Sequence, residues 1–217
     1  MPQAAKVLFC DHETDCGGAQ LSLLELIGGL DRERYTPLLA CSGDGPLADR
    51  ARDAGAEIHF VPMLFEGKLR KLLGLRRAAG RLADLIRAQR VRLVHTNTLI
   101  AGYCGLSAAR RGSVPCVWHL RDLSYPGVGR WACRRANRVL ANSSAAAAAL
   151  GGPPDKLRVV YNGVDAAFFA GADGESVRAE LGVAAGETVV GMNSAIAATA
   201  EYSKYDSVTS PRASSIV

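Results

Sequence analysis

Seven short apolar runs recur along the chain, and helical patterns separate most of them. This alternation restricts the fold more than any other feature of the sequence. A strand that is buried on both faces reads as a continuous apolar run, and strands that alternate with helices favour a parallel sheet covered on both sides. The sequence therefore predicts a doubly wound α/β domain with a parallel sheet. The predicted strands are 7–10, 37–41, 58–61, 92–95, 115–120, 138–141 and 157–161.

Polar clusters follow five of these strands. In open α/β sheets, ligands bind in the crevice beyond the carboxyl ends of the strands. The residues that follow the strands are therefore expected to meet at one edge of the sheet and to form the functional site there. His95 ends the fourth run and is either a core residue or part of this site. The five clusters are 11–15, 95–98, 119–122, 142–144 and 162–165.

Two adjacent glycines, Gly17 and Gly18, lie between the first predicted strand and a helical run that starts at Ala19. Glycine lets backbone N–H groups approach a ligand closely, and the first N–H groups of a helix favour an anion. The pair therefore predicts a phosphate site, with a tight turn that binds nothing as the alternative. The loop has no G-x-G-x-x-G pattern, which argues against another Rossmann-like enzyme such as an epimerase or a nicotinamide dehydrogenase.

One segment carries the excess of positive charge. The net charge is +5, and the segment 66–92 alone contains nine basic and two acidic residues. Its apolar residues recur near helical spacing, with most of the basic residues off that stripe, which predicts a long amphipathic helix. Such a helix either covers the sheet or binds an anionic membrane surface through residues 68–90. The remaining charge is balanced and is not interleaved with aromatic residues, so nucleic-acid binding is not expected.

The rest of the composition indicates a cytoplasmic globular protein. Hydrophobic residues make up 48% of the chain, which is enough for a folded core. The six cysteines lack paired C-x-x-C spacing and are expected to be reduced, and the four histidines form no H-E-x-x-H pattern, so no metal site is expected. The sequence has no apolar leader and no apolar run of membrane-spanning length. We therefore expect a cytoplasmic location, with peripheral contact to the inner membrane face through the basic helix.

The motifs at the strand ends, taken in order, resemble the amino-terminal half of family 4 glycosyltransferases over about residues 5–192. These motifs are Gly-Gly-Ala-Gln at 17–20, His-x-x-Asp at 119–122, Ala-Asn-Ser at 141–143 and Tyr-Asn-Gly-Val-Asp at 161–165. Members of this family are retaining, use nucleotide sugars and consist of two facing Rossmann-like domains. The resemblance implies a Rossmann-like acceptor-side domain, which in the complete enzyme takes part in transferring a sugar to a lipid, a polysaccharide or a small-molecule acceptor.

The resemblance also implies roles for individual residues. Gly17 and Gly18 would flank the donor diphosphate, and His119 and Asp122 would be the catalytic residues that line the cleft near the reacting carbon. Backbone donors and cations can stabilise a departing diphosphate without a metal, so no metal and no cofactor are expected beside the nucleotide-sugar substrate. The acceptor-side cleft would be formed by Thr96, Asn97, Arg121, Ser143 and Asn162, the last of which is also expected to cap a turn.

The last part of the sequence departs from the family pattern. We expect the Rossmann-like domain at 4–165, an interdomain segment with the first strand of a second domain at 166–192, and an atypical, disordered tail at 193–217. The family places an arginine and a lysine for the donor phosphates after that strand, whereas this sequence continues with Asn193-Ser194-Ala195. The chain is therefore expected to be a truncated or frame-shifted enzyme that is inactive alone. The alternative is a non-catalytic binding or membrane-anchoring subunit that pairs with a separate donor domain.

Overall fold

The computed structural model describes residues 4–64, 67–121, 126–150, 155–164, 166–171, 174–184 and 186–189. The chain divides into two compact units, Met1–Val164 and Asp165–Val217. The first unit contains a large sheet and the residues that form the candidate site. The described part of the second unit contains the short helices α7 (Ala166–Ala170) and α8 (Gly174–Glu180).

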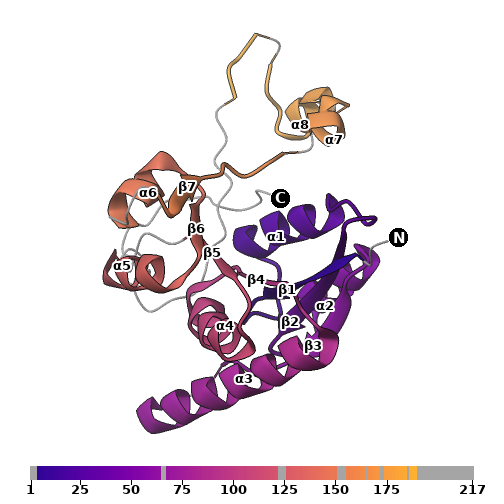
Figure 1. Ribbon diagram of the computed structural model, residues 1–217. Helices are drawn as coiled ribbons and strands as arrows, with labels where there is room; N and C mark the ends of the chain where they lie inside the picture. The colour runs from indigo at the N-terminus through magenta and orange to yellow at the C-terminus, as the bar shows by residue number, and fades with distance from the viewer. Residues whose placement is uncertain are drawn as a thin grey trace. The chain divides into compact units, whose positions relative to one another are not determined.

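A seven-stranded sheet forms the centre of the first unit (Figure 1). Neighbouring strands are all parallel, and their order is β3-β2-β1-β4-β5-β6-β7. Each apolar run in the sequence overlaps one of these strands, so the predicted doubly wound, Rossmann-like α/β fold is confirmed. The strands are β1 (Ala5–Cys10), β2 (Tyr35–Cys41), β3 (Glu57–Phe60), β4 (Leu93–Thr96), β5 (Cys116–Leu120), β6 (Arg138–Ala141) and β7 (Leu157–Val159).

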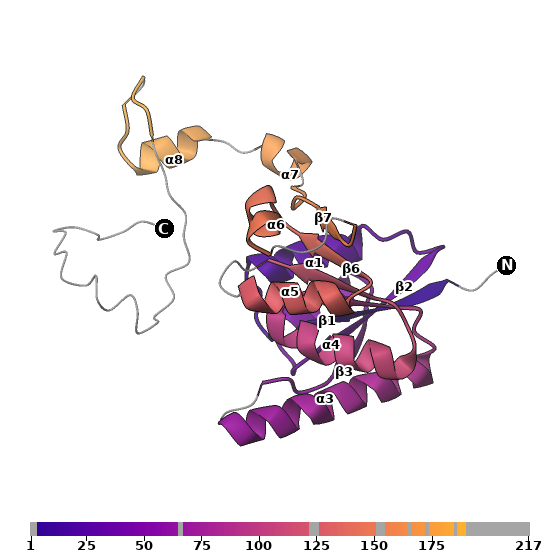
Figure 2. The ribbon, with the colours of Figure 1, turned by 60° about the vertical axis from the view of Figure 1, so that its left-hand side comes forward.

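Helices cover both faces of this sheet, as Figures 1 and 2 show. Side chains of α1 and α2, such as Leu23, form one core with Phe9 and its neighbours on the same face. Side chains of α3 to α6, such as Leu82, form a second core with Trp118 on the opposite face. The helices of this unit are α1 (Gly18–Gly28), α2 (Pro46–Asp53), α3 (Lys68–Gln89), α4 (Leu99–Gly112), α5 (Pro126–Arg135) and α6 (Ser144–Leu150).

Helix α4 approaches the sheet closely because two of its residues are glycines. A Cβ atom built on Gly102 would lie 2.1 Å from Cε2 of Trp118, and one built on Gly105 would lie 2.3 Å from Cγ2 of Thr96. Trp118 is fully buried, and its indole N–H donates to the backbone carbonyl of Thr98 (3.2 Å). The two glycines thus let α4 pack directly against Trp118 and Thr96. Because Trp118 is also hydrogen-bonded to Thr98, this close packing holds Thr98, the N-cap residue of α4, in position.

The predicted basic helix is α3, and it packs beside α4. Its middle and end contribute Ala78, Leu82 and Ile86 to the core. Leu72 and Leu73, near its start, are exposed instead. The amphipathic pattern thus holds for the later turns of the helix, whereas the first turns have an apolar face without a covering element in the described part of the chain.

The second unit differs from the expectation at one place. Residues 187–189, where the sequence predicts the start of a strand, have an irregular backbone. A lone strand gains no stable pairing, and the described part of this unit offers it no partner strand. Residues 190–217 lie outside the described residues, so the predicted boundaries at 165 and 192 and the predicted character of the tail stay predictions.

The six cysteines are free, and five of them are buried, which agrees with reduced core residues. None of the helices in the described ranges is both long enough and apolar enough to cross a bilayer.

Candidate functional site

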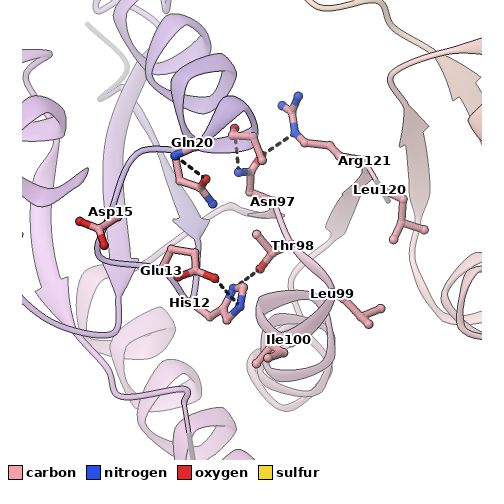
Figure 3. A pocket seen from close by; sticks show the side chains of 12 residues that line it. His12, Glu13, Asp15, Gln20, Asn97, Thr98, Leu99, Ile100, Leu120 and Arg121 are labelled. Atoms are coloured by element: carbon pink, nitrogen blue, oxygen red, sulfur yellow. Dashed lines mark hydrogen bonds and ion pairs between the residues drawn. The ribbon is translucent and has the colours of Figure 1, made fainter. Parts of the chain in front are cut away.

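A pocket of about 810 Å³ opens at the carboxyl ends of the strands. It lies between β1 and β4, where the strand order reverses and where doubly wound sheets bind their ligands. The loops after β1, β4 and β5 form its wall, together with the first turns of α1 and α4 (Figure 3). The residues that line it are His12, Glu13, Asp15, Gly17, Ala19, Gln20, Asn97, Thr98, Leu99, Ile100, Leu120 and Arg121.

The glycine pair opens the first turn of α1 at this pocket. Gly17 is the N-cap residue, and its carbonyl accepts the N–H of Leu21 (2.9 Å). The N–H of Gly17 donates to Oε1 of Gln20 (3.2 Å). A Cβ atom on Gly18 would meet no atom within 4 Å. Because the first N–H groups of a helix lack intrahelical acceptors and form the positive end of its dipole, this open turn can receive an anion.

Asp11, the residue after β1, is fully buried. Its carboxylate accepts hydrogen bonds from Nε2 of Gln20 (3.2 and 3.1 Å), from Nδ2 of Asn97 (2.7 Å) and from the N–H of Glu13 (3.0 Å). Burying a charged group costs several kcal/mol unless polar partners surround it, and three donor groups do so here. The carboxylate therefore joins the loop after β1 to α1 and to the end of β4.

Arg121, after β5, extends these contacts. Its Nε–H donates to Oδ1 of Asn97 (3.0 Å), Nη1 donates to Oδ1 of Asn162 (2.8 Å), and Nη2 lies 3.1 Å from Nδ1 of His119. Burial lowers the pKa of Arg121, and the nearby Asp11 carboxylate acts in the opposite direction. We call the connected residues the Asp11 network. Its members are Asp11, Gly17, Gln20, Asn97, Arg121, His119 and Asn162.

His119 and His95 form a buried pair on neighbouring strands. Their ring centroids are 5.8 Å apart in an edge-to-face arrangement. Burial lowers the pKa of His95 to about 3, with smaller contributions from His119 and Arg121, and burial followed by Arg121 lowers the pKa of His119 to about 4. Both rings are therefore neutral near pH 7. Nε2 of each ring is buried and has no hydrogen-bond partner among the described residues.

A second polar group lines the pocket around His12 (Figure 3). Nδ1 of His12 lies 2.8 Å from Oγ1 of Thr98, and Nε2 lies 3.0 Å from Oε1 of Glu13. Leu99 and Ile100 follow Thr98 in the pocket wall. The pocket thus offers hydrogen-bonding groups and apolar surface side by side, which suits a ligand with hydroxyl groups and apolar parts.

Most of the predicted site residues gather at this pocket. Gly17, Asn97 and Arg121 line it, and Arg121 connects it to His119 and Asn162. Gly18 follows Gly17 in the first turn of α1. The structure thus brings these residues together, while the roles expected for them stay predictions.

Two predicted residues belong neither to the pocket wall nor to the Asp11 network. Thr96 is fully buried, its methyl group faces Gly105 of α4, and its hydroxyl has no hydrogen-bond partner among the described residues. The hydroxyl of Ser143 accepts the N–H of Ala146 (3.1 Å) at the start of α6. Asp122 lies outside the described residues. Neither Thr96 nor Ser143 lines the pocket.

The sequence did not identify the two residues whose hydrogen bonds connect the loop after β1 to α1 at the pocket. Asp11 was only one member of a polar cluster, and Gln20 was only the last residue of the glycine motif. A signal was available for Asp11, because a carboxylate that directly follows a strand of a buried sheet must find several donors. Which donors these are depends on the tertiary structure, so Gln20 and Asn97 could not be assigned as its partners.

The family model described as Glycosyltransferase Family 4 matches residues 16–168, which is more than half of the chain. Anabaena HepE in complex with UDP and glucose is 26% identical, with a TM-score of 0.65 over 82% of this chain and 50% of HepE. A glycosyltransferase from Rickettsia africae is 16% identical, with a TM-score of 0.66 over 85% of this chain and 51% of its own. Acinetobacter baumannii MurG is 15% identical, with a TM-score of 0.59 over 74% and 46%. No curated protein matches the chain.

The chain spans about half the length of these solved structures. The family match begins one residue before the glycine pair, includes every later strand of the sheet and ends within α7. It therefore contains the four strand-end motifs that resemble the family in the sequence. The chain belongs to glycosyltransferase family 4.

Proposed function

We propose that this chain forms the acceptor-side half of a retaining glycosyltransferase that uses a nucleotide sugar. The observation that carries the proposal is the open first turn of α1 at Gly18, beside the pocket at which the strand order reverses. Such a turn offers backbone N–H groups to a diphosphate. HepE has been crystallised with UDP-glucose as well as with UDP and glucose, which supports a nucleotide-sugar donor and makes UDP-glucose the first compound to test.

In the proposed reaction, the acceptor hydroxyl attacks the anomeric carbon on the face from which the nucleoside diphosphate leaves. The new carbon–oxygen bond forms as the bond to the diphosphate breaks. The diphosphate keeps the bonding electrons, and one of its oxygens takes the acceptor proton. The N–H groups of α1 stabilise the charge that develops on the leaving group without a metal or another cofactor. Neutral His119 orients and polarises the donor rather than attacking it, and we assign Asp122 to the same cleft.

The described residues are proposed to supply one wall of this site, and the 217-residue chain is proposed to transfer no sugar by itself. Among the described residues that line the pocket, one is an arginine, Arg121. Its N–H groups already donate to Asn97, Asn162 and His119. A departing diphosphate requires further positive charge. We assign that charge to a donor domain, in a longer chain or in a separate subunit. The acceptor, a lipid, a polysaccharide or a small molecule, would bind beside Leu99 and Ile100.

Alanine at position 18 is expected to weaken UDP binding at least about tenfold, or about 1.4 kcal/mol, without weakening the fold. The added methyl group meets no protein atom within 4 Å, and alanine favours a helix more than glycine does. The methyl group would instead shield the N–H groups that the diphosphate approaches. Isothermal titration of UDP and UDP-glucose into both proteins measures the difference.

The matched control is Gly28→Ala at the other end of α1, where an added Cβ atom also meets nothing within 4 Å. This variant should bind UDP as the unaltered chain does. Equal affinities of the Gly18→Ala variant and the unaltered chain, or the absence of any UDP binding, would contradict the proposed diphosphate site.

We also propose that the first turns of α3 bind an anionic membrane surface from the cytoplasmic side. Leu72 and Leu73 are 48% and 44% exposed, and Arg70, Arg76 and Arg77 are exposed beside them. These turns extend past α4 in both views (Figures 1 and 2). Exposed leucines among arginines match a surface that has anionic headgroups above an apolar layer.

The double variant Arg76→Gln/Arg77→Gln is expected to bind vesicles of phosphatidylglycerol and phosphatidylcholine about 30-fold more weakly, because each basic residue near such a surface contributes about 1 kcal/mol. Vesicle co-sedimentation at low salt measures this change. Arg87→Gln/Arg90→Gln removes the same charge at the opposite end of α3 and serves as the control. Equal losses in the two double variants would show a diffuse charge effect and would count against the proposed face.

A further inference from the structure

The buried carboxylate of Asp11 stands at the junction of two hydrogen-bonded branches. One branch runs through Gln20 to the backbone of Gly17, and the other runs through Asn97 and Arg121 to His119. We propose that Asp11 is a positioning residue: its carboxylate orients the side-chain amides of Gln20 and Asn97 and, through Asn97, places Arg121, whose donor to Nδ1 holds His119 with its ring proton on Nε2.

The first branch follows from what each group can donate or accept. Both oxygens of Asp11 accept, so Gln20 must turn its NH₂ group toward them. The carbonyl Oε1 of Gln20 then points the other way and accepts the N–H of Gly17 (3.2 Å). Asp11 therefore determines how the first turn of α1 is held at the pocket.

The second branch is longer but follows the same rule. Asn97 donates from Nδ2 to Asp11 (2.7 Å) and to the carbonyl of Ala19 (3.1 Å), which uses both hydrogens of its amide. Its Oδ1 is left to accept the Nε–H of Arg121 (3.0 Å). A guanidinium group has only donors, so Nδ1 of His119 accepts from Nη2 of Arg121 (3.1 Å). A neutral imidazole that accepts at Nδ1 carries its proton on Nε2.

The result is a neutral His119 whose Nε2–H group is a fixed donor. This nitrogen is buried and has no partner among the described residues. The assignment of that donor to a sugar oxygen rests on the proposed function. The direction of the hydrogen bonds does not, because it follows from the contacts within the chain.

Asparagine at position 11 tests the proposal because it keeps the shape of the side chain and replaces one acceptor by a donor. Oδ2 receives Asn97 and Gln20, and Oδ1 receives Gln20 and the N–H of Glu13. In either orientation of the new amide, its NH₂ group therefore faces at least one N–H donor. The network can accommodate this only by turning Gln20 or Asn97 or by losing a bond.

Nuclear magnetic resonance of the whole chain follows both branches through three signals. Hydrogen exchange of the Gly17 amide reports the first branch, and hydrogen exchange of the Arg121 Nε–H and the ¹⁵N shift of His119 Nδ1 report the second. In Asp11→Asn, exchange is expected to accelerate roughly tenfold in at least one branch, as for the loss of one hydrogen bond. When the second branch is the one affected, the His119 Nδ1 signal should move as well.

Two variants with the same replacement separate the branches. Gln20→Met is expected to change the Gly17 signal alone. Arg121→Met removes the Arg121 Nε–H signal and is expected to change the His119 signal while it leaves the Gly17 signal unchanged. Asp31→Asn is the matched control, because Asp31 also accepts the N–H two residues later (3.0 Å) but is exposed. It should change none of the three signals.

The proposal is overturned if Asp11→Asn leaves all three signals unchanged, or if the two methionine variants disturb both branches equally. If the Asp11→Asn variant does not fold, Asn97→Leu provides the test. It removes the amide that connects Asp11 to Arg121 and keeps both of those side chains. Under the proposal it changes the Arg121 and His119 signals. Unchanged signals in that variant overturn the proposal.

A chain that shows the predicted pattern but binds no UDP would refute the proposed function and leave the positioning role of Asp11 intact.

Discussion

Alanine in place of Gly102 is expected to lower the free energy of unfolding by about 3 kcal/mol, at the upper end of overpacking in a core. The new Cβ atom would lie 2.1 Å from Cε2 and 2.3 Å from Cζ2 of Trp118, whereas carbon atoms pack at about 3.5–4.0 Å. Trp118 cannot move aside easily, because it is fully buried and its indole N–H is bonded to the carbonyl of Thr98. Moving α4 away instead would disrupt its contacts with the sheet and shift the pocket wall.

Denaturant unfolding of the variant and of Gly28→Ala measures this effect. Gly28 is also a helical glycine, but its added methyl group would meet no atom within 4 Å. The control should therefore be neutral or more stable by about 0.5–1 kcal/mol, the usual gain from replacing glycine in a helix. A Gly102→Ala variant as stable as Gly28→Ala would show that α4 does not pack against Trp118 as the structure has it.

The fold is largely predictable from the sequence because buried parallel strands have a direct compositional signal. Every residue of such a strand faces a covering helix, so apolar runs such as 37–41 mark the strands without reference to the rest of the chain. The edge that carries the site follows from the same reading, since parallel strands place their carboxyl ends together. At 187–189, where the start of a strand is expected, the described part of the chain offers no neighbouring strand, and an apolar run forms a stable strand only beside one.

The two acceptor-side residues that belong neither to the pocket wall nor to the Asp11 network could have been recognised from local patterns. Alternation along a strand puts Thr96 on the same face as Val94, which belongs to the core beneath α4. Ser143 directly precedes an alanine-rich helix, where serine commonly serves as the cap. In both cases a local structural role accounts for the residue.

The Asp11 network could not be predicted in this way. Its contacts join residues up to 86 positions apart, such as Asp11 and Asn97. Their partners depend on how the loops after β1, β4 and β5 converge, and no local period encodes that convergence. The sequence can indicate that polar groups meet at this edge, but only the fold shows which group donates to which.

The free energy of unfolding is expected to fall steeply as the pH is lowered from 6.5 to about 5, because His95 and His119 remain neutral in the folded chain. Their pKa values are about 3 and about 4, lowered chiefly by burial, whereas the ordinary value is 6.5. Below pH 6.5 the unfolded chain binds protons at both positions and the folded chain does not. Stability is therefore complete above pH 6.5 and is lost as the pH falls toward the folded pKa values.

The size of the effect follows from the same values. One pKa unit corresponds to about 1.4 kcal/mol, so the difference between 6.5 and about 4 corresponds to roughly 3 kcal/mol for His119. Replacing His95 by phenylalanine removes one of the two protons and should reduce the slope of stability against pH by up to about 1.4 kcal/mol per pH unit. Denaturant titrations at several pH values measure both slopes, and the interval above about pH 8 serves as the control, since both histidines are neutral there in either state.

Equal slopes in the two proteins between pH 6.5 and 5 would show that His95 takes up a proton in the folded chain. The ring would then need a partner for its charge. Among the described residues, Arg121 is the charged group that acts on both rings, and it opposes that charge. Equal slopes would therefore place water or a carboxylate beside Nε2 of His95. A smaller slope in the variant requires the neutral pair in which His119 can act as a fixed donor.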